Sequence, residues 1–229
     1  MGIFDRFKKN KIEDLDVQIK EDFKIKDNSD VEKEVEQFEQ VENNVIHGPY
    51  DISQAHEKNK YLNMGALRIP AIPDMQVIPD PSPQEGYYTS VTLVLEESAL
   101  NLMVLSDSKS GGLWAELLEL LSEDFNSQSA NPIETAGRYG REIVATVTAS
   151  TPDGRKGTEK MRFIGVEGPR WVLRAIVTGK AMHDEETEKI IENVFEKVIV
   201  DRGENPIPPG EILLLDLPEE LPEMLQEKE

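Results

Sequence analysis

The segment from Met161 to Gly179 limits the fold more than any other part of the sequence. Two runs rich in apolar and β-branched residues lie on either side of Glu167-Gly168-Pro169. Gly168 can take the positive φ that a tight hairpin requires, and Pro169 restricts the residue before it and removes an N–H donor. The segment therefore predicts two antiparallel strands joined by a turn at these three residues.

Hydrophobic periodicity predicts the remaining elements. Runs of alternating or β-rich residues indicate strands, and apolar residues recurring every three or four positions indicate amphipathic helices. Strands are expected at 75–78, 87–95, 99–105, 142–149, 158–166 and 171–178, and helices from Leu113 to Phe125 and from Asp184 to Val198. This order predicts an α+β fold with a mostly antiparallel sheet and two main amphipathic helices.

The charge of the chain restricts its partners and its location. The 45 acidic and 25 basic residues give a formal net charge of −20, which repels phosphate backbones and argues against a general nucleic-acid binder. The absence of cysteine excludes a disulfide framework and thiolate chemistry. No apolar run is long enough to span a bilayer, and the N-terminus lacks the apolar core of a secretory signal. A cytoplasmic location is expected.

Charge and aromatic content divide the chain into three regions. Residues 1–11 carry four basic residues and one acid, a net of +3, whereas 12–46 carry twelve acids and four bases, a net of −8. Both tryptophans and all five tyrosines lie within 47–218. We therefore expect a flexible charged tail at 1–46, a single α+β domain at 47–218, and an acidic tail at 219–229.

Five short segments of the expected domain carry a family resemblance. They are Gly48-Pro49-Tyr50-Asp51, Leu67 to Pro73, Gly112-Leu113-Trp114, Arg162 to Trp171, and Pro206-Ile207-Pro208-Pro209. Together they resemble an actinobacterial family catalogued as domain of unknown function 3710, over about residues 47–218. The family brings no established activity or ligand. The succession of hairpins and helices also looks like the Mog1/PsbP-like α/β/α sandwich, whose members are mostly binding and assembly factors.

Common catalytic signatures are absent from the sequence. It has no phosphate loop, dinucleotide-binding glycine motif, nucleophile elbow or zinc-binding H-E-x-x-H helix. His183 to Glu186 could suggest a metal cluster, but acids at this place are typical of a helix start. Ser108 and Ser110, beside two glycines, indicate a loop that enters a helix rather than a nucleophile or an anion cradle. No catalytic, cofactor-binding or metal-binding residue is predicted.

Two arginines are the candidate ligand or partner contacts. Strand alternation places Arg174 on the same face as Val172, Ile176 and Thr178, between the apolar neighbours Val172 and Ile176 and away from Trp171. One interpretation is a structural ion pair with a sheet acid such as Glu142 or Glu159. The alternative is a cleft in which Arg174, together with Arg170, binds a carboxylate or phosphate.

The two ends of the chain carry further candidate contacts. Ile3, Phe4 and Phe7 share one helical face, and Lys8 and Lys9 lie beside them, a pattern typical of weak binding to an anionic membrane surface. A disordered basic start explains the same residues. Residues 212–217 form an apolar run that either packs on the chain's own sheet or contacts another chain.

These observations favour a non-enzymatic interaction or assembly module. The expected partner is a protein, with no nucleic acid, no cofactor, and at most weak peripheral contact with the inner face of the membrane. The alternative is a hydrolase or small-ligand sensor with an arginine-lined cleft. Convergent polar groups in one concave pocket would favour that alternative.

Overall fold

The computed structural model describes residues 48–55, 60–127, 130–150 and 156–217. The chain divides into two units, Met1–Val41 and Glu42–Glu229, and all described residues belong to the second. The membrane-contact candidates Ile3, Phe4, Phe7, Lys8 and Lys9 lie outside the described residues.

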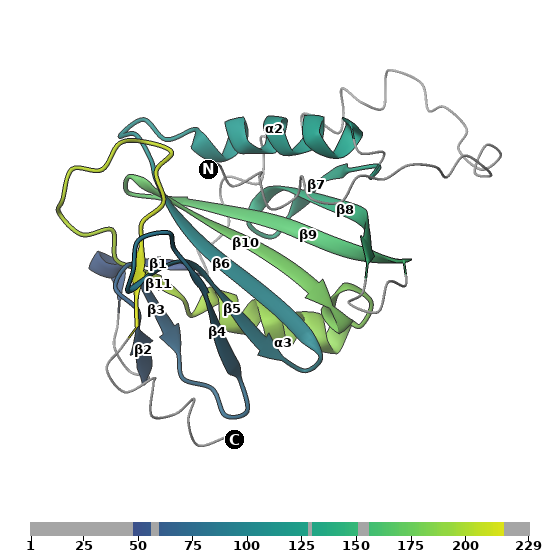
Figure 1. The fold of residues 1–229 in the computed structure, drawn as a ribbon, viewed down its shortest axis with the longest axis horizontal. Helices are drawn as coiled ribbons and strands as arrows, with labels where there is room; N and C mark the ends of the chain where they lie inside the picture. Colours follow the sequence, from purple (N-terminus) through teal and green to yellow (C-terminus); the bar gives the residue numbers. More distant parts are fainter. Residues whose placement is uncertain (1–47, 56–59, 128–129, 151–155, 218–229) are drawn as a thin grey trace. The chain divides into compact units, whose positions relative to one another are not determined.

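A large, fully antiparallel sheet forms the centre of this unit (Figure 1). Its strand order is β12-β5-β6-β10-β9-β8-β7, and β4 also pairs with β5. The strands are β4 (Gln76–Pro81), β5 (Tyr87–Leu95), β6 (Ser98–Ser106), β7 (Ile133–Gly137), β8 (Gly140–Ser150), β9 (Lys156–Gly168), β10 (Trp171–Gly179) and β12 (Leu215–Asp216). The central position of β10 follows from its apolar side chains on both faces, since all residues from Trp171 to Val177 are buried.

A smaller sheet has the strand order β1-β11-β3-β2. Its strands are β1 (Tyr50–Asp51), β11 (Ile199–Val200), β3 (Leu67–Pro70) and β2 (Tyr61–Asn63). The pairing of β1 with β11 is parallel, with Tyr50 opposite Ile199. Two short 3₁₀ segments, η3 (Ile52–Gln54) and η4 (Lys180–Met182), follow β1 and β10.

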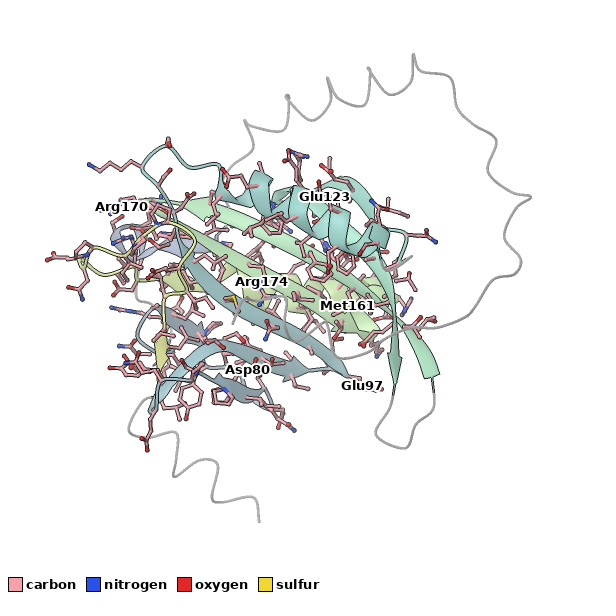
Figure 2. The ribbon with its side chains drawn as sticks, turned by 45° about the horizontal axis from the view of Figure 1, so that its top comes forward. Asp80, Glu97, Glu123, Met161, Arg170 and Arg174 are labelled. Carbon is pink, nitrogen blue, oxygen red and sulfur yellow. The ribbon has the colours of Figure 1, made fainter. Side chains whose placement is uncertain are left out.

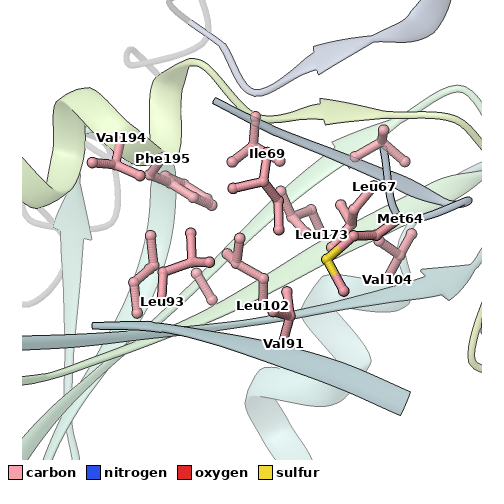
Figure 3. Close-up of a cluster of buried hydrophobic side chains, with 14 of the residues drawn as sticks. Met64, Leu67, Ile69, Val91, Leu93, Leu102, Val104, Leu173, Val194 and Phe195 are labelled. Carbon is pink, nitrogen blue, oxygen red and sulfur yellow. The ribbon is translucent and has the colours of Figure 1, made fainter. Parts of the chain in front are cut away.

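The two α-helices pack on opposite faces of the large sheet. On the first face, which we call the α2 face, helix α2 (Leu113–Ser127) places Trp114 over Gly165 and the ring of Phe125 5.2 Å from that of Phe163. On the other, the α3 face, helix α3 (Glu185–Glu196) and the small sheet enclose the main apolar core (Figure 3). The core includes Leu67, Ile69, Leu93, Leu102, Val104, Leu173, Val194 and Phe195. This arrangement and its mostly antiparallel sheet confirm the predicted α+β class.

The predicted hairpin is present, but its turn has a different geometry. β9 ends at Gly168 and β10 begins at Trp171, and Arg170, not Gly168, has the positive φ, at 63°. Gly168 is required for another reason. A Cβ at this position would lie 2.1 Å from the indole ring of Trp171, so only glycine leaves room for that ring.

The apolar run at 212–217 packs on its own chain. Leu213 and Leu215 are buried in the main core, and Leu215 of β12 lies opposite Tyr88 of β5. The sequence left open whether this run covers its own sheet or contacts another chain. The structure places it on the edge of the large sheet.

Candidate functional site

Arg174 lies in the middle of the α2 face, on the central strand β10. Strand register places it between Met103 of β6 and Gly165 of β9. In Figure 2 it lies between Asp80 of β4 on one side and helix α2, marked by Glu123, on the other. The side chain is only 8% exposed, so its charge is removed from water. A charge in this position requires polar partners nearby.

Those partners come from β4, β5 and β6 and form a connected network. Arg174 donates from Nη2 to Oδ1 of Asn101 at 2.6 Å. Asn101 in turn donates from Nδ2 to Oγ1 of Thr92 at 2.9 Å, Oδ2 of Asp80 at 3.1 Å and Oγ of Ser90 at 3.3 Å. Ser90 donates to the same Asp80 oxygen at 2.6 Å. We call Asp80, Ser90, Thr92, Asn101 and Arg174 the polar strip.

The polar strip does not fully compensate the guanidinium. Burial lowers the pKa of Arg174 to about 10, although the carboxylate of Asp80 acts in the opposite direction. The Nε atom of Arg174 is buried and has no hydrogen-bond partner. Arg174 is still protonated at neutral pH, and its buried Nε–H group is an unpaired donor within the fold.

A second buried arginine, Arg162 of β9, lies on the opposite face. It donates to Glu142 at 3.0 Å, and to Glu188 and Glu192 of α3 at 2.9 Å each. Burial lowers the pKa of Arg162, but the hydrogen bonds and charges of Glu142 and Glu192 outweigh it and raise the pKa overall. Glu142, one of the two sheet acids suggested as a partner of Arg174, therefore pairs with Arg162, and that suggestion is wrong. Strand register explains why Glu142 pairs with Arg162, because it places both side chains on the α3 face.

The carboxylate of Glu167 caps the N-terminus of α2. Its Oε1 accepts hydrogen bonds from the backbone N–H groups of Gly112 and Trp114, both at 3.0 Å. The first N–H groups of a helix have no partner within the helix and favour negative charge. Glu167 occupies this position, so the structure supports a helix-entry loop rather than an anion cradle at Ser108 and Ser110.

Trp171 and Asp51 join the start of the described domain to its central strand. The indole N–H of Trp171 donates to Oδ2 of Asp51 at 2.8 Å, and Ser53 donates to Oδ1 from its backbone at 2.9 Å. Burial raises the pKa of Asp51, but these hydrogen bonds outweigh it and lower the pKa overall. Nearby, a Cβ at Gly48 would lie 1.9 Å from the carbonyl oxygen of Glu196, so Gly48 packs directly on the end of α3.

These contacts involve three of the five segments that carried the family resemblance, and the family model described as "Protein of unknown function (DUF3710)" matches residues 48–224. The chain belongs to the DUF3710 family. The structure gives its motif residues physical roles: Gly48 and Asp51 fix the entry to the domain, Trp114 covers Gly165, and Glu167 caps α2.

Known structures resemble this DUF3710 domain only loosely. A crystal structure from Bacteroides thetaiotaomicron matches 71% of the chain with 14% identity and a TM-score of 0.39, and the chain spans about half, 54%, of that protein. The solution structure of cyanobacterial PsbP (CyanoP) from Synechocystis matches 67% of the chain, and all of that protein, with 6% identity and a TM-score of 0.36. No curated protein matches the chain significantly.

The structure does not bring the two predicted ligand-contact arginines of the DUF3710 domain together. Arg170 lies in the exposed turn before β10, and its carbonyl oxygen accepts from the Arg202 guanidinium at 3.1 Å and from the Asp107 backbone at 2.9 Å. Arg174 lies four residues further along, in the middle of the sheet (Figure 2). At about 3.3 Å per strand residue, their Cα atoms are separated by roughly 13 Å.

The structure also bears on three smaller questions raised by the sequence, namely the start of α3, a metal cluster and a membrane-spanning helix. Asp184 caps α3 by accepting from the Thr187 backbone at 2.9 Å, as its place at the helix start predicts. Among the residues that the structure describes, no group of three or more His, Asp or Glu is arranged to hold a metal ion. No helix in the described ranges is long and apolar enough to cross a membrane.

The sequence did not predict the other members of the polar strip. A signal for them exists, because Ser90 and Thr92 alternate with Val91 and Leu93, and Asn101 lies between Leu100 and Leu102. Alternation of this kind indicates a strand face that is not part of an apolar core. Reading it together with Arg174 would have predicted a polar patch.

Proposed function

We propose that this DUF3710 chain is a non-enzymatic protein-interaction module that docks a partner protein on the β4–β6 part of the α2 face. The observation that carries the proposal is the uneven cover of that face. Under α2, Ile143 and Phe163 are almost fully buried. Over β4 to β6, Ile78 is 49% exposed, and Thr92 and Asn101 are half-buried. A single exposed apolar side chain is common on protein surfaces, so the support for docking is the part of the sheet face that α2 leaves partly open to solvent around Ile78, Thr92 and Asn101.

The face, rather than the edge, of this part of the sheet is suited to docking. β4 pairs with β5 at the margin of the large sheet, and its sequence contains Pro79 and Pro81. Proline has no N–H to donate, and it blocks the addition of a further strand. A partner would therefore contact the side chains of Ile78 and its neighbours instead of extending the sheet.

The alternative, a hydrolase or small-ligand sensor with an arginine-lined cleft, is less well supported. Such a cleft would use Arg170 and Arg174 together, and these residues lie at different places along β10. The buried charge of Arg174 supports only the sensing part of this alternative. A cytoplasmic location, an actinobacterial origin, the exclusion of nucleic acid and weak peripheral membrane contact remain predictions.

A pair of matched surface variants tests the proposal. Ile78→Glu places a charge on the proposed docking face, whereas Ile190→Glu places it on the exposed side of α3, where the native side chain is 37% exposed. Both variants should retain the native melting temperature. In affinity capture from cell extract, we expect Ile78→Glu to lose specific partners that the native chain and Ile190→Glu retain. Equal recovery by both variants would contradict the proposed docking face.

A further inference from the structure

Helix α2 carries two apolar seams, and the sheet covers one of them. Where two helices pack along their length, the contacting residues recur at alternating intervals of about four and three positions. The first such series, which we call the sheet seam, faces β8 and β9 and consists of Trp114, Leu118, Leu121 and Phe125. The second, the outer seam, begins one position earlier and consists of Leu113, Leu117, Leu120 and Asp124. One residue turns the direction of a side chain by about 100°, so the outer seam faces sideways from α2.

The two seams differ in exposure. The buried members of the sheet seam are at most 6% exposed, whereas Leu120 is 50% exposed, and Leu113 and Leu117 are half-buried. A single exposed leucine is common on protein surfaces. Three leucines in one seam are a stronger signal, because this spacing is the pattern by which one helix packs on another. Within the described ranges the other α-helix, α3, packs on the opposite face of the sheet and does not fill this role.

The outer seam faces the part of the sheet that α2 leaves open. Glu119 lies on the other flank of the helix, where its charge acts on Arg141 of β8. The outer seam is therefore directed towards β10 and β6. Figure 2 shows the sheet continuing in that direction from α2, past Arg174 and as far as Asp80 of β4. Packed helices lie about 8–10 Å apart and neighbouring strands about 4.8 Å apart, so a helix against the outer seam would lie over β10 and β6.

The charges beside the outer seam restrict what can pack on it. Glu116 and Glu123 are exposed and lie one position before Leu117 and Asp124, on the solvent side of the seam. In paired helices, side chains at such flanking positions form ion pairs that select the partner. All the charged side chains of α2 are acidic, and the chain as a whole carries −20. A basic helix is therefore favoured, and a second copy of this chain is opposed by repulsion.

We propose that the outer seam of α2 docks a basic amphipathic helix of the partner protein. Apolar side chains of that helix would contact Leu113, Leu117 and Leu120, and lysine or arginine would lie opposite Glu116 and Glu123. The inference rests on the proposed function, and it names the chemistry of the partner. A helix in this position would complete the helical layer of the α2 face, which α2 begins over β8 and β9.

Two designed peptides of three heptads each are the probes. Both have leucine at the a and d positions, and the e and g positions are all lysine in one peptide and all glutamate in the other. Like charges at these positions discourage each peptide from pairing with itself. Binding to the full chain is measured by fluorescence anisotropy at physiological salt, where attraction between distant charges is largely screened. We expect saturable binding of the lysine peptide and no binding of the glutamate peptide.

Two pairs of matched variants locate the binding. Leu120→Gln should weaken binding of the lysine peptide by about tenfold or more. Ile133→Gln is its control, because Ile133 is 61% exposed on β7, away from the outer seam, and this variant should bind as the native chain does. Glu123→Lys should weaken binding of the same peptide, whereas Glu119→Lys, with the same change in net charge on the other flank, should leave it nearly unchanged.

Each other outcome overturns a stated part of the inference. No binding of either peptide excludes a basic helix as the occupant, and equal binding of both excludes the charge assignment. Equal effects of Leu120→Gln and Ile133→Gln, or of Glu123→Lys and Glu119→Lys, exclude the outer seam as the site. Where Leu120→Gln lowers the melting temperature, the two glutamate variants, both at exposed positions, decide the question. The peptides need no native partner, so a failure here is distinct from failure of the capture experiment with Ile78→Glu.

Discussion

The indole N–H of Trp171 donates to the carboxylate of Asp51 at 2.8 Å, across 120 residues of sequence. This bond joins β1 of the small sheet to β10, the central strand of the large sheet. Asp51 also accepts from Ser53 and so begins the 3₁₀ turn η3. A single carboxylate thus links the two sheets, and its removal should destabilise the whole domain.

Asp51→Ala should lower the free energy of unfolding by about 1–3 kcal/mol, because it leaves the buried indole N–H without an acceptor. Asp51→Asn keeps an acceptor oxygen and should cost less. Chemical denaturation of the native chain and both variants measures the difference. Equal stability of the alanine variant and the native chain would mean that this bond contributes nothing.

Removal of the Glu167 carboxylate should destabilise the start of α2. Glu167→Ala should lower the free energy of unfolding by about 0.5–2 kcal/mol, the usual cost of losing a helix cap. Glu167→Gln keeps the acceptor oxygen and should retain most of the stability. Hydrogen exchange of the Gly112 and Trp114 amides should accelerate in the alanine variant, since these amides are the donors. Unchanged exchange at both amides would exclude the cap.

Arg162→Met should be severely destabilising, by about 3–5 kcal/mol, because it leaves Glu142 buried without its counter-ion. Arg138→Met is the matched control. Arg138 also pairs with α3 carboxylates, Glu192 and Glu196, but its side chain is 46% exposed. An exposed pair is worth about 0–1 kcal/mol, so the control should stay near the native stability. Similar losses in the two variants would contradict the difference in burial.

The Glu142 carboxyl should make stability depend on pH. Burial raises its pKa above the ordinary value of 4.5, more than the hydrogen bond from Arg162 lowers it. Above pH 4.5 the unfolded chain loses the Glu142 proton, while the folded chain still holds it until the pH passes the higher pKa of the folded state. The proton stabilises the folded state, and its contribution to the free energy of unfolding falls as the pH rises through this range. Glu142→Gln removes the titration. Denaturation curves across this range should show the native chain losing stability relative to the variant, and parallel pH profiles would refute the assignment.

Gly165→Ala should disrupt the packing of α2 on the sheet. A Cβ at Gly165 would lie 2.0 Å from the Trp114 ring, whereas one at Gly157, in the same strand β9, would meet nothing within 4 Å. Overpacking of this kind costs about 1–3 kcal/mol. Thermal unfolding should show a clear loss for Gly165→Ala and little change for Gly157→Ala. Equal effects would mean that strand propensity, not the Trp114 contact, requires the glycine.

The longer elements could be predicted because their signals are local. The alternation of β5 and β6 and the helical spacing of α2 lie within continuous runs of sequence. The small sheet could not be predicted in this way. Its strands β1 and β11 have two residues each, as does β12 in the large sheet, and these strands exist because of distant partners, such as Ile199 opposite Tyr50. No local pattern encodes such a pairing.

The candidate site shows the same limit. Alternation correctly separated Arg174 from Trp171 and Leu173, but it could not choose among partners on other strands. That choice depends on register, which places Val144 opposite Arg162 and so turns Glu142 away from Arg174. The role of Asn101 depends in the same way on its position opposite Ile176 and Thr92.

The central claim is that a partner protein docks on the β4–β6 part of the α2 face, and photo-crosslinking in cells tests it most directly. A photoreactive amino acid at position 78 lies on that face, and one at position 190 lies on α3 at a comparable exposure. We predict that position 78 forms a crosslink to a discrete partner and that position 190 does not form the same crosslink. The same crosslinks from both positions, or none from position 78, would contradict the claim.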